Sequence, residues 1–121
     1  MSLREKIFSA KDIPSEMVEV PEWGISVEVR GMSGADRTRI LELAGLVDGS
    51  VNLQVVYPEI VIATAHDPET GEKVFEYGDR DALMSKSAVA IDRLAMIGMK
   101  LSGFTEESQV NAGKQFPQAT E

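Results

Sequence analysis

Residues 18–47 constrain the fold of this chain more than any other stretch, because they have the pattern of two short strands followed by a helix. Apolar and polar residues alternate through residues 18–20 and again through 25–30, which is the period of a strand buried on one side. Between these two runs, residues 21–24 begin with proline and end with glycine, as residues of tight turns commonly do. The pattern therefore predicts a β-hairpin.

The same alternation predicts the register of the hairpin. If Val20 pairs with Ile25, then Val18 faces Val27 across the two strands. All five apolar residues, with Val29 as the fifth, then share one face, which would be the buried one. We also expect the ring of the turn residue, Trp23, to fold over an edge of the core, because an aromatic ring offers a large apolar area.

An amphipathic helix is predicted after the hairpin. Ser33 is suited to cap its N-terminus, and Asp36 in its first turn suits the positive end of the helix dipole. Apolar residues then recur at helical spacing, at Ile40, Leu43, Ala44 and Val47. We expect this helix and the hairpin to cover each other's apolar faces.

The middle of the chain fits more than one kind of secondary structure. Residues 51–57 have a helical pattern, and Pro58 is expected to interrupt it or to begin a new helix. Residues 58–66 fit two interpretations, because their length and β-branched residues suit a strand whereas the leading proline and Glu59 suit a helix start. We favour the helix. Residues 67–71 then predict a turn, and residues 73–76 an extended segment.

Two helices are predicted in the last third of the chain. A short one covers residues 78–86, and the longest of the chain covers residues 88–102. Ser87 is placed to cap the long helix, and Gly103 to end it. A weak last helix can start at residue 105.

The expected fold class is α+β: a small, mainly helical domain with an N-terminal β-hairpin packed on amphipathic helices. A chain of 121 residues can bury one core but not two. We therefore predict a single domain over residues 1–113. Residues 114–121 are polar and lack anchoring apolar residues, so we expect them to form a disordered tail.

Composition excludes several classes of protein. Hydrophobic residues make up 43% of the chain, too many for a disordered protein, yet no apolar run approaches the ~20 residues of a membrane span. No signal peptide is visible, and the absence of cysteine excludes disulfides and thiol chemistry. Twelve basic and 20 acidic residues give a net charge of −8, which argues against nucleic acid and anionic membranes as partners.

The single histidine does not predict a metal site. His66 is followed by Asp67 and Glu69, but the spacing matches neither a tetrahedral zinc pattern nor a complete calcium loop. Because Asp-Pro and Thr-Gly pairs favour turns, we interpret this region as a turn.

Other candidate sites are no stronger. Gly31 and Gly34 precede a helix, but without a following lysine or a third glycine they suit a hinge better than a phosphate site. Asp79 and Asp81 lie in an open, charged turn, which does not favour general acid–base catalysis. We therefore predict a protein that is not an enzyme and that binds no metal or cofactor.

The helix over residues 88–102 carries the clearest indication of function. Its polar arc is marked by Asp92, Arg93 and Lys100. Val89 and Met96 fall inside that arc and Met99 lies at its edge, where an ordinary surface helix would carry charge. Either the first or the last helix of the same chain covers these three residues, or they form a stripe that binds a partner helix, for which methionine is suited because it adapts to variable apolar surfaces.

Several segments of the chain, taken in order, carry a resemblance to a known family. They are residues 12–16, 20–24, 27–37, 57–59, 67–71, 74–75, 101–107 and 113–114. In this order they resemble the tail assembly chaperones of long-tailed bacteriophages, above all those of actinobacterial phages and prophages. The resemblance spans most of residues 11–114.

The resemblance implies a role without catalysis. Proteins of this family bind the tape measure protein in the cytoplasm of the infected bacterium, help to recruit the major tail protein, and are absent from the finished particle. It therefore implies these two protein partners and no nucleic acid or membrane, and it leaves self-association open. The alternatives are a structural subunit of the tail or neck and an unrelated small protein-binding domain.

Overall fold

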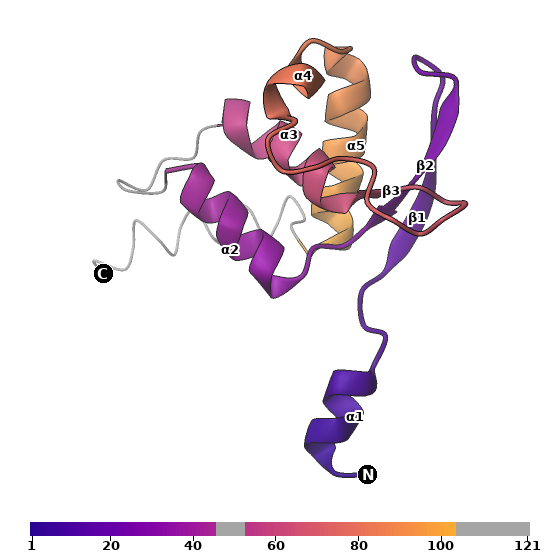
Figure 1. Cartoon of the computed structure of the whole chain (residues 1–121), viewed down its shortest axis with the longest axis vertical. Helices are drawn as coiled ribbons and strands as arrows, with labels where there is room; N and C mark the ends of the chain where they lie inside the picture. Colours follow the sequence, from indigo (N-terminus) through magenta and orange to yellow (C-terminus); the bar gives the residue numbers. More distant parts are fainter. Residues whose placement is uncertain (46–52, 104–121) are drawn as a thin grey trace.

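The computed structural model describes residues 1–45 and 53–103, and within them it confirms the α+β class (Figure 1). Its elements, in chain order, are α1 (Leu3–Ser9), β1 (Ser15–Val20), β2 (Ile25–Arg30), α2 (Gly34–Leu43), α3 (Leu53–Thr64), β3 (Ala65–His66), α4 (Arg80–Met84) and α5 (Ala88–Leu101). The predicted tail, residues 114–121, and the predicted helix start at residue 105 lie outside the described residues.

The hairpin has the predicted register. Val18 pairs with Val27 and Val20 with Ile25 in the antiparallel β1–β2 pair. Gly24 ends the turn with φ = 65°, a left-handed conformation that glycine adopts without strain. The short strand β3 pairs antiparallel with the other edge of β2, so the sheet has the order β1-β2-β3.

Four of the five apolar hairpin residues are buried, and the fifth is not. Val18, Val20, Val27 and Val29 are at most 6% exposed, whereas Ile25 is 50% exposed. The prediction that Ile25 is buried is therefore wrong. It begins β2 directly after the turn, opposite Val20, which is 0% exposed, so the buried part of this face ends between the two paired residues.

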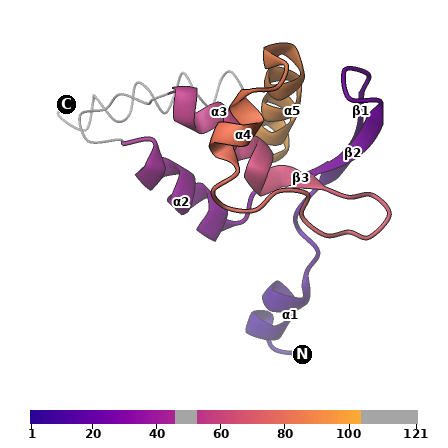
Figure 2. The ribbon, with the colours of Figure 1, turned by 45° about the horizontal axis from the view of Figure 1, so that its top comes forward.

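The buried face of the hairpin is covered mainly by α5, together with α3. We expected the helix that follows the hairpin to cover it, but α2 packs on α3 instead. Ile40 and Ala44 are buried, while Leu43 is 41% exposed; Val47 lies outside the described residues. Because α3 occupies the space beside the sheet, α2 forms an outer layer (Figure 2).

Helix α3 is the centre of the core. Residues 58–66 are all buried, and the helical interpretation holds through Thr64, after which Ala65 and His66 form β3. Pro58 does not interrupt or begin a helix as predicted, because it lies inside α3. As the sixth residue of α3, Pro58 cannot donate the intrahelical hydrogen bond of that position, yet the helix continues through it to Thr64.

The two longest helices approach each other closely at Gly98 of α5. A Cβ atom at this position would lie 2.8 Å from Cγ2 of Ile60 and 3.0 Å from Oγ1 of Thr64. The predicted ends of α5 are confirmed, since Ser87 accepts the Ala90 amide and Gly103 has φ = 88°. The fold thereby fixes which face of α5 points to solvent.

Candidate functional site

The exposed side of α5 carries a narrow line of alternating apolar and basic side chains. Val89, Arg93, Met96 and Lys100 follow one another at spacings of four and three residues, so they lie along one face of the helix. Val89 is 62% exposed and Met96 is 58% exposed. We refer to these four residues as the α5 stripe.

Both basic residues of the α5 stripe are held by the hairpin. Arg93 donates from both terminal nitrogens to the two carboxylate oxygens of Glu22 at 2.6 and 2.9 Å, and Nζ of Lys100 lies 3.3 Å from Oε1 of Glu16. The Arg93 guanidinium lowers the pKa of the Glu22 carboxyl to about 2. The hairpin thus fixes the charged side chains and leaves Val89 and Met96 uncovered by the described residues.

Met99, the third predicted binding residue, lies elsewhere. Its exposed fraction is 7%, and it belongs to the hydrophobic core together with Leu94 and Ala95. The prediction that it forms the edge of an exposed stripe is therefore wrong. Val89 and Met96 are exposed, whereas Met99 is buried in the core. Helix α1 has no buried residue, and the predicted last helix lies outside the described residues.

Sequence reasoning missed the acidic half of this surface. Neither Glu16 nor Glu22 is predicted as part of a site, although both pair with α5. The one available signal was opposite charge: Arg93 and Lys100 on the helix are basic, whereas Glu16 and Glu22 of the hairpin are acidic. Periodicity alone could not show that these two elements are neighbours.

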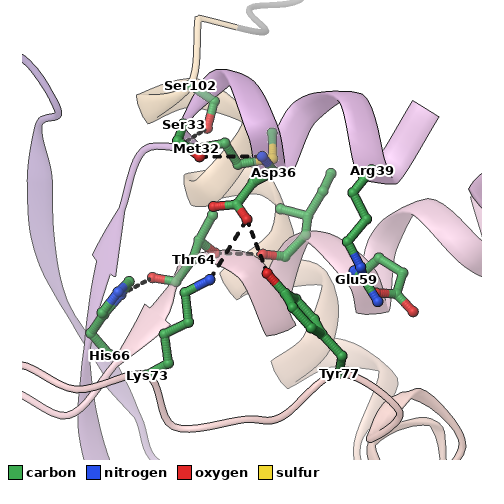
Figure 3. Close-up of polar contacts among 11 residues, drawn as sticks. Met32, Ser33, Asp36, Arg39, Glu59, Thr64, His66, Lys73, Tyr77 and Ser102 are labelled. Atoms are coloured by element: carbon green, nitrogen blue, oxygen red, sulfur yellow. Dashed lines mark hydrogen bonds and ion pairs between the residues drawn. The ribbon is translucent and has the colours of Figure 1, made fainter. Parts of the chain in front are cut away.

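A second polar cluster joins α2 to the segment between β3 and α4 (Figure 3). Oδ1 of Asp36 lies 3.6 Å from Nζ of Lys73 and 3.5 Å from the hydroxyl of Tyr77. The Arg39 guanidinium lies 3.9 Å from the centre of the Tyr77 ring. Every charged member has a partner within the cluster, so its role is to hold the segment against α2.

His66 is part of the fold and not of a metal centre. Its Nδ1 lies 2.8 Å from the backbone oxygen of Thr64, and the ring is buried. The following turn forms as predicted, with Asp67 Oδ1 accepting the Glu69 amide at 2.8 Å. No group of three or more potential metal ligands occurs among residues 1–45 and 53–103.

The other two candidate sites of the sequence, at Gly31–Gly34 and at Asp79 and Asp81, contain residues with local structural roles. After Gly31, Ser33 caps α2 by accepting the Asp36 amide at 3.2 Å, and Asp79 accepts the Glu76 amide at 2.9 Å.

Among the helices that the structure describes, none is long and apolar enough to cross a membrane.

Comparison with known proteins shows a likeness of fold. No protein-family model matches the chain, and no curated protein matches it. The fold is similar to that of a solved structure described as the bacteriophage HK97 tail assembly chaperone, with a TM-score of 0.60 and 24% sequence identity. The match covers 81% of this chain and 91% of that one. The two proteins therefore share a fold over nearly all of the HK97 chain.

Proposed function

We propose that this protein is a phage tail assembly chaperone, which binds the tape measure protein and helps to recruit the major tail protein. It acts in the cytoplasm of the host without catalysing a reaction, and it is absent from the mature virion. The observation that carries the proposal is the shared fold with the HK97 tail assembly chaperone, which extends over 91% of that chain. The order of sequence motifs, which resembles that of the tail assembly chaperones of actinobacterial phages, supports the proposal independently of the fold.

The α5 stripe is the surface that we assign to the client protein. It exposes Val89 and Met96, which can pack against an apolar helix. Methionine adapts to differently shaped apolar side chains, as a protein must when it binds many segments of one long client. The flanking ion pairs hold Arg93 and Lys100 beside these residues. This surface can therefore bind apolar residues without being a rigid pocket.

A capture experiment with a matched control tests this assignment. Met96→Glu places a charge in the α5 stripe, and Met17→Glu places the same charge at a methionine of nearly equal exposure on β1, 57% against 58%. We expect Met96→Glu to lower the recovery of co-expressed tape measure fragments at least tenfold and Met17→Glu to leave it unchanged. Equal recovery with both variants would remove the stripe from the binding surface.

The structural-subunit alternative makes the opposite prediction about location. A chaperone is expected in infected cells and absent from purified virions, whereas a tail or neck subunit is abundant in them. Mass spectrometry of a virion preparation separates the two through peptides that contain Ile40 or Leu94. A gene position between the major tail protein and a very long tape measure gene would favour the chaperone.

A further inference from the structure

Helix α1 stands apart from the rest of the molecule. It has seven residues, none of them buried, and residues 10–14 connect it to β1 below the body of the protein (Figures 1 and 2). Its apolar side chains Leu3, Ile7 and Phe8 are 73%, 58% and 73% exposed. Because helices shorter than about 12 residues are marginal on their own in water, this one gains stability when its apolar side binds a surface.

Charge separates this segment from the rest of the chain. Residues 1–11, which we call the arm, carry three basic side chains and one acidic one, whereas the remaining residues carry nine basic and 19 acidic side chains. Six basic residues of the body form ion pairs within the described structure. In that same structure Arg4, Lys6 and Lys11 form none. The arm is therefore complementary in charge to the body of its own chain.

The body contains a groove suited to an apolar side chain. It has a volume of about 250 Å³ and lies between α3, α4 and α5, lined by Tyr57, Pro58, Met84, Lys86, Ala88, Ile91 and Asp92. A cavity of about 150 Å³ is enough to hold benzene, so the groove has room for the ring of Phe8. Asp92 forms no ion pair among the described residues and can receive Arg4 or Lys6, and Lys86, also unpaired there, can receive Glu5.

We infer that the arm of one copy docks in the α3/α4/α5 groove of a second copy, with Phe8 as the apolar anchor. The groove of the same copy is not the acceptor, because α1 and α4 lie at opposite ends of the molecule (Figure 1). Arm and groove are different surfaces, so the contact is heterologous and each copy can both give an arm and receive one. This inference is independent of the proposed function, because it uses neither Val89 nor Met96.

The mass of the full chain in solution gives the first test. By light scattering, we expect the average mass of the unmodified protein to exceed that of one chain, to rise with concentration and to fall at high salt, which screens the charge contacts. Phe8→Glu should leave a monomer without loss of folding, because Phe8 packs against no part of the described body. Ser9→Glu adds the same charge to the opposite side of α1 and should still associate.

Mixing two variants gives the decisive test. Phe8→Glu keeps a working groove, whereas Met84→Glu, at a residue that is 48% exposed, keeps a working arm. Each variant alone should be monomeric, and an equimolar mixture should form a dimer and nothing larger, because only one arm and one groove remain. The inference is overturned if the unmodified protein is monomeric at all concentrations, if the single variants still associate, or if their mixture stays monomeric.

Discussion

Arg93 of α5 and Glu22 of the hairpin turn lie 71 positions apart in the sequence and form an ion pair with two parallel hydrogen bonds. The two distances, 2.6 and 2.9 Å, are those of charge-assisted bonds, and the paired geometry fixes the plane of the guanidinium. Lys100 and Glu16 form a second bridge along the same helix. The hairpin and α5 are thus joined at two points on either side of Met96.

The first prediction concerns the pH dependence of this pair. The pKa of Glu22 is lowered from 4.5 to about 2 in the folded protein. A lowered carboxyl pKa contributes stability that is present above the unfolded pKa and is lost as the pH falls through the folded one. The contribution of the pair should therefore be complete near pH 6, mostly lost by pH 2 and absent only below it.

Comparison of the unmodified protein with Glu22→Gln isolates this effect from the other carboxylates. We expect the urea midpoint of the variant to be lower at pH 6, and the difference to shrink as the pH falls from about 4.5 toward 2. Because the pair is exposed to solvent, high salt should also reduce the difference. A difference that is constant with pH would show that Glu22 acts through packing and not through its charge.

The second prediction concerns the close approach of α5 to α3. Gly98→Ala introduces a Cβ atom 2.8 Å from a carbon of Ile60, and overpacking of this kind costs about 1–3 kcal/mol. The higher helix propensity of alanine returns up to about 1 kcal/mol. We expect a net loss of about 1–2 kcal/mol in the free energy of unfolding, measured by urea denaturation.

Gly34→Ala is the control for this change. Gly34 begins α2, and a Cβ atom there would have no neighbour within 4 Å. The same substitution should therefore leave stability unchanged or raise it slightly. Equal losses at both positions would indicate that the α3–α5 contact can relax around an added methyl group.

The sequence predicts local features of this fold well, and contacts between distant elements poorly. Alternation alone places Val18 opposite Val27, because a register depends on neighbours in the same hairpin. The sequence does not show that α5, and not α2, covers the hairpin, because both helices carry apolar residues and the choice depends on the space that α3 fills. The ion pair between Arg93 and Glu22 cannot be predicted from the sequence for the same reason.

Met99 shows the limit of a helical wheel. The wheel gives the direction of a side chain around the helix axis, and it places Met99 near the polar arc. It carries no information about what lies beside each turn of the helix. Met99 is 7% exposed and belongs to the core cluster, whereas Met96, three residues earlier, is 58% exposed. A candidate surface could thus be predicted, but its extent could not.

The third prediction concerns a buried carboxylate. Glu59 of α3 is 3% exposed and bridges two elements, with Nη1 of Arg39 at 2.8 Å and Nη1 of Arg80 at 3.4 Å. Glu59→Gln removes the charge and leaves both guanidinium groups without their partner. Because each arginine is about one-third exposed and can be hydrated, we expect a loss of about 2 kcal/mol, below the 3–5 kcal/mol typical of fully buried pairs.

A surface pair provides the comparison for Glu59. Glu28→Gln breaks an ion pair with Arg30 on the same strand, and pairs of this kind contribute at most about 1 kcal/mol. The loss in Glu28→Gln should therefore be clearly smaller than in Glu59→Gln when both are measured by urea denaturation at neutral pH. Similar small losses in both variants would mean that water reaches Glu59 in solution.

The last prediction separates the two methionines of α5 by their roles. Met99→Ala removes a side chain that is 7% exposed and belongs to the core, a change that costs about 2–5 kcal/mol. Met96→Ala removes one that is 58% exposed, and substitutions at such surface positions usually change stability by less than about 0.5 kcal/mol. Binding of tape measure fragments should show the reverse order when it is measured on folded protein at low temperature: Met96→Ala weakens it, whereas Met99→Ala has little effect. Weaker binding with Met99→Ala alone would place the client surface at Met99 and not on the α5 stripe, and a large loss of stability with Met96→Ala would show that Met96 is covered in solution.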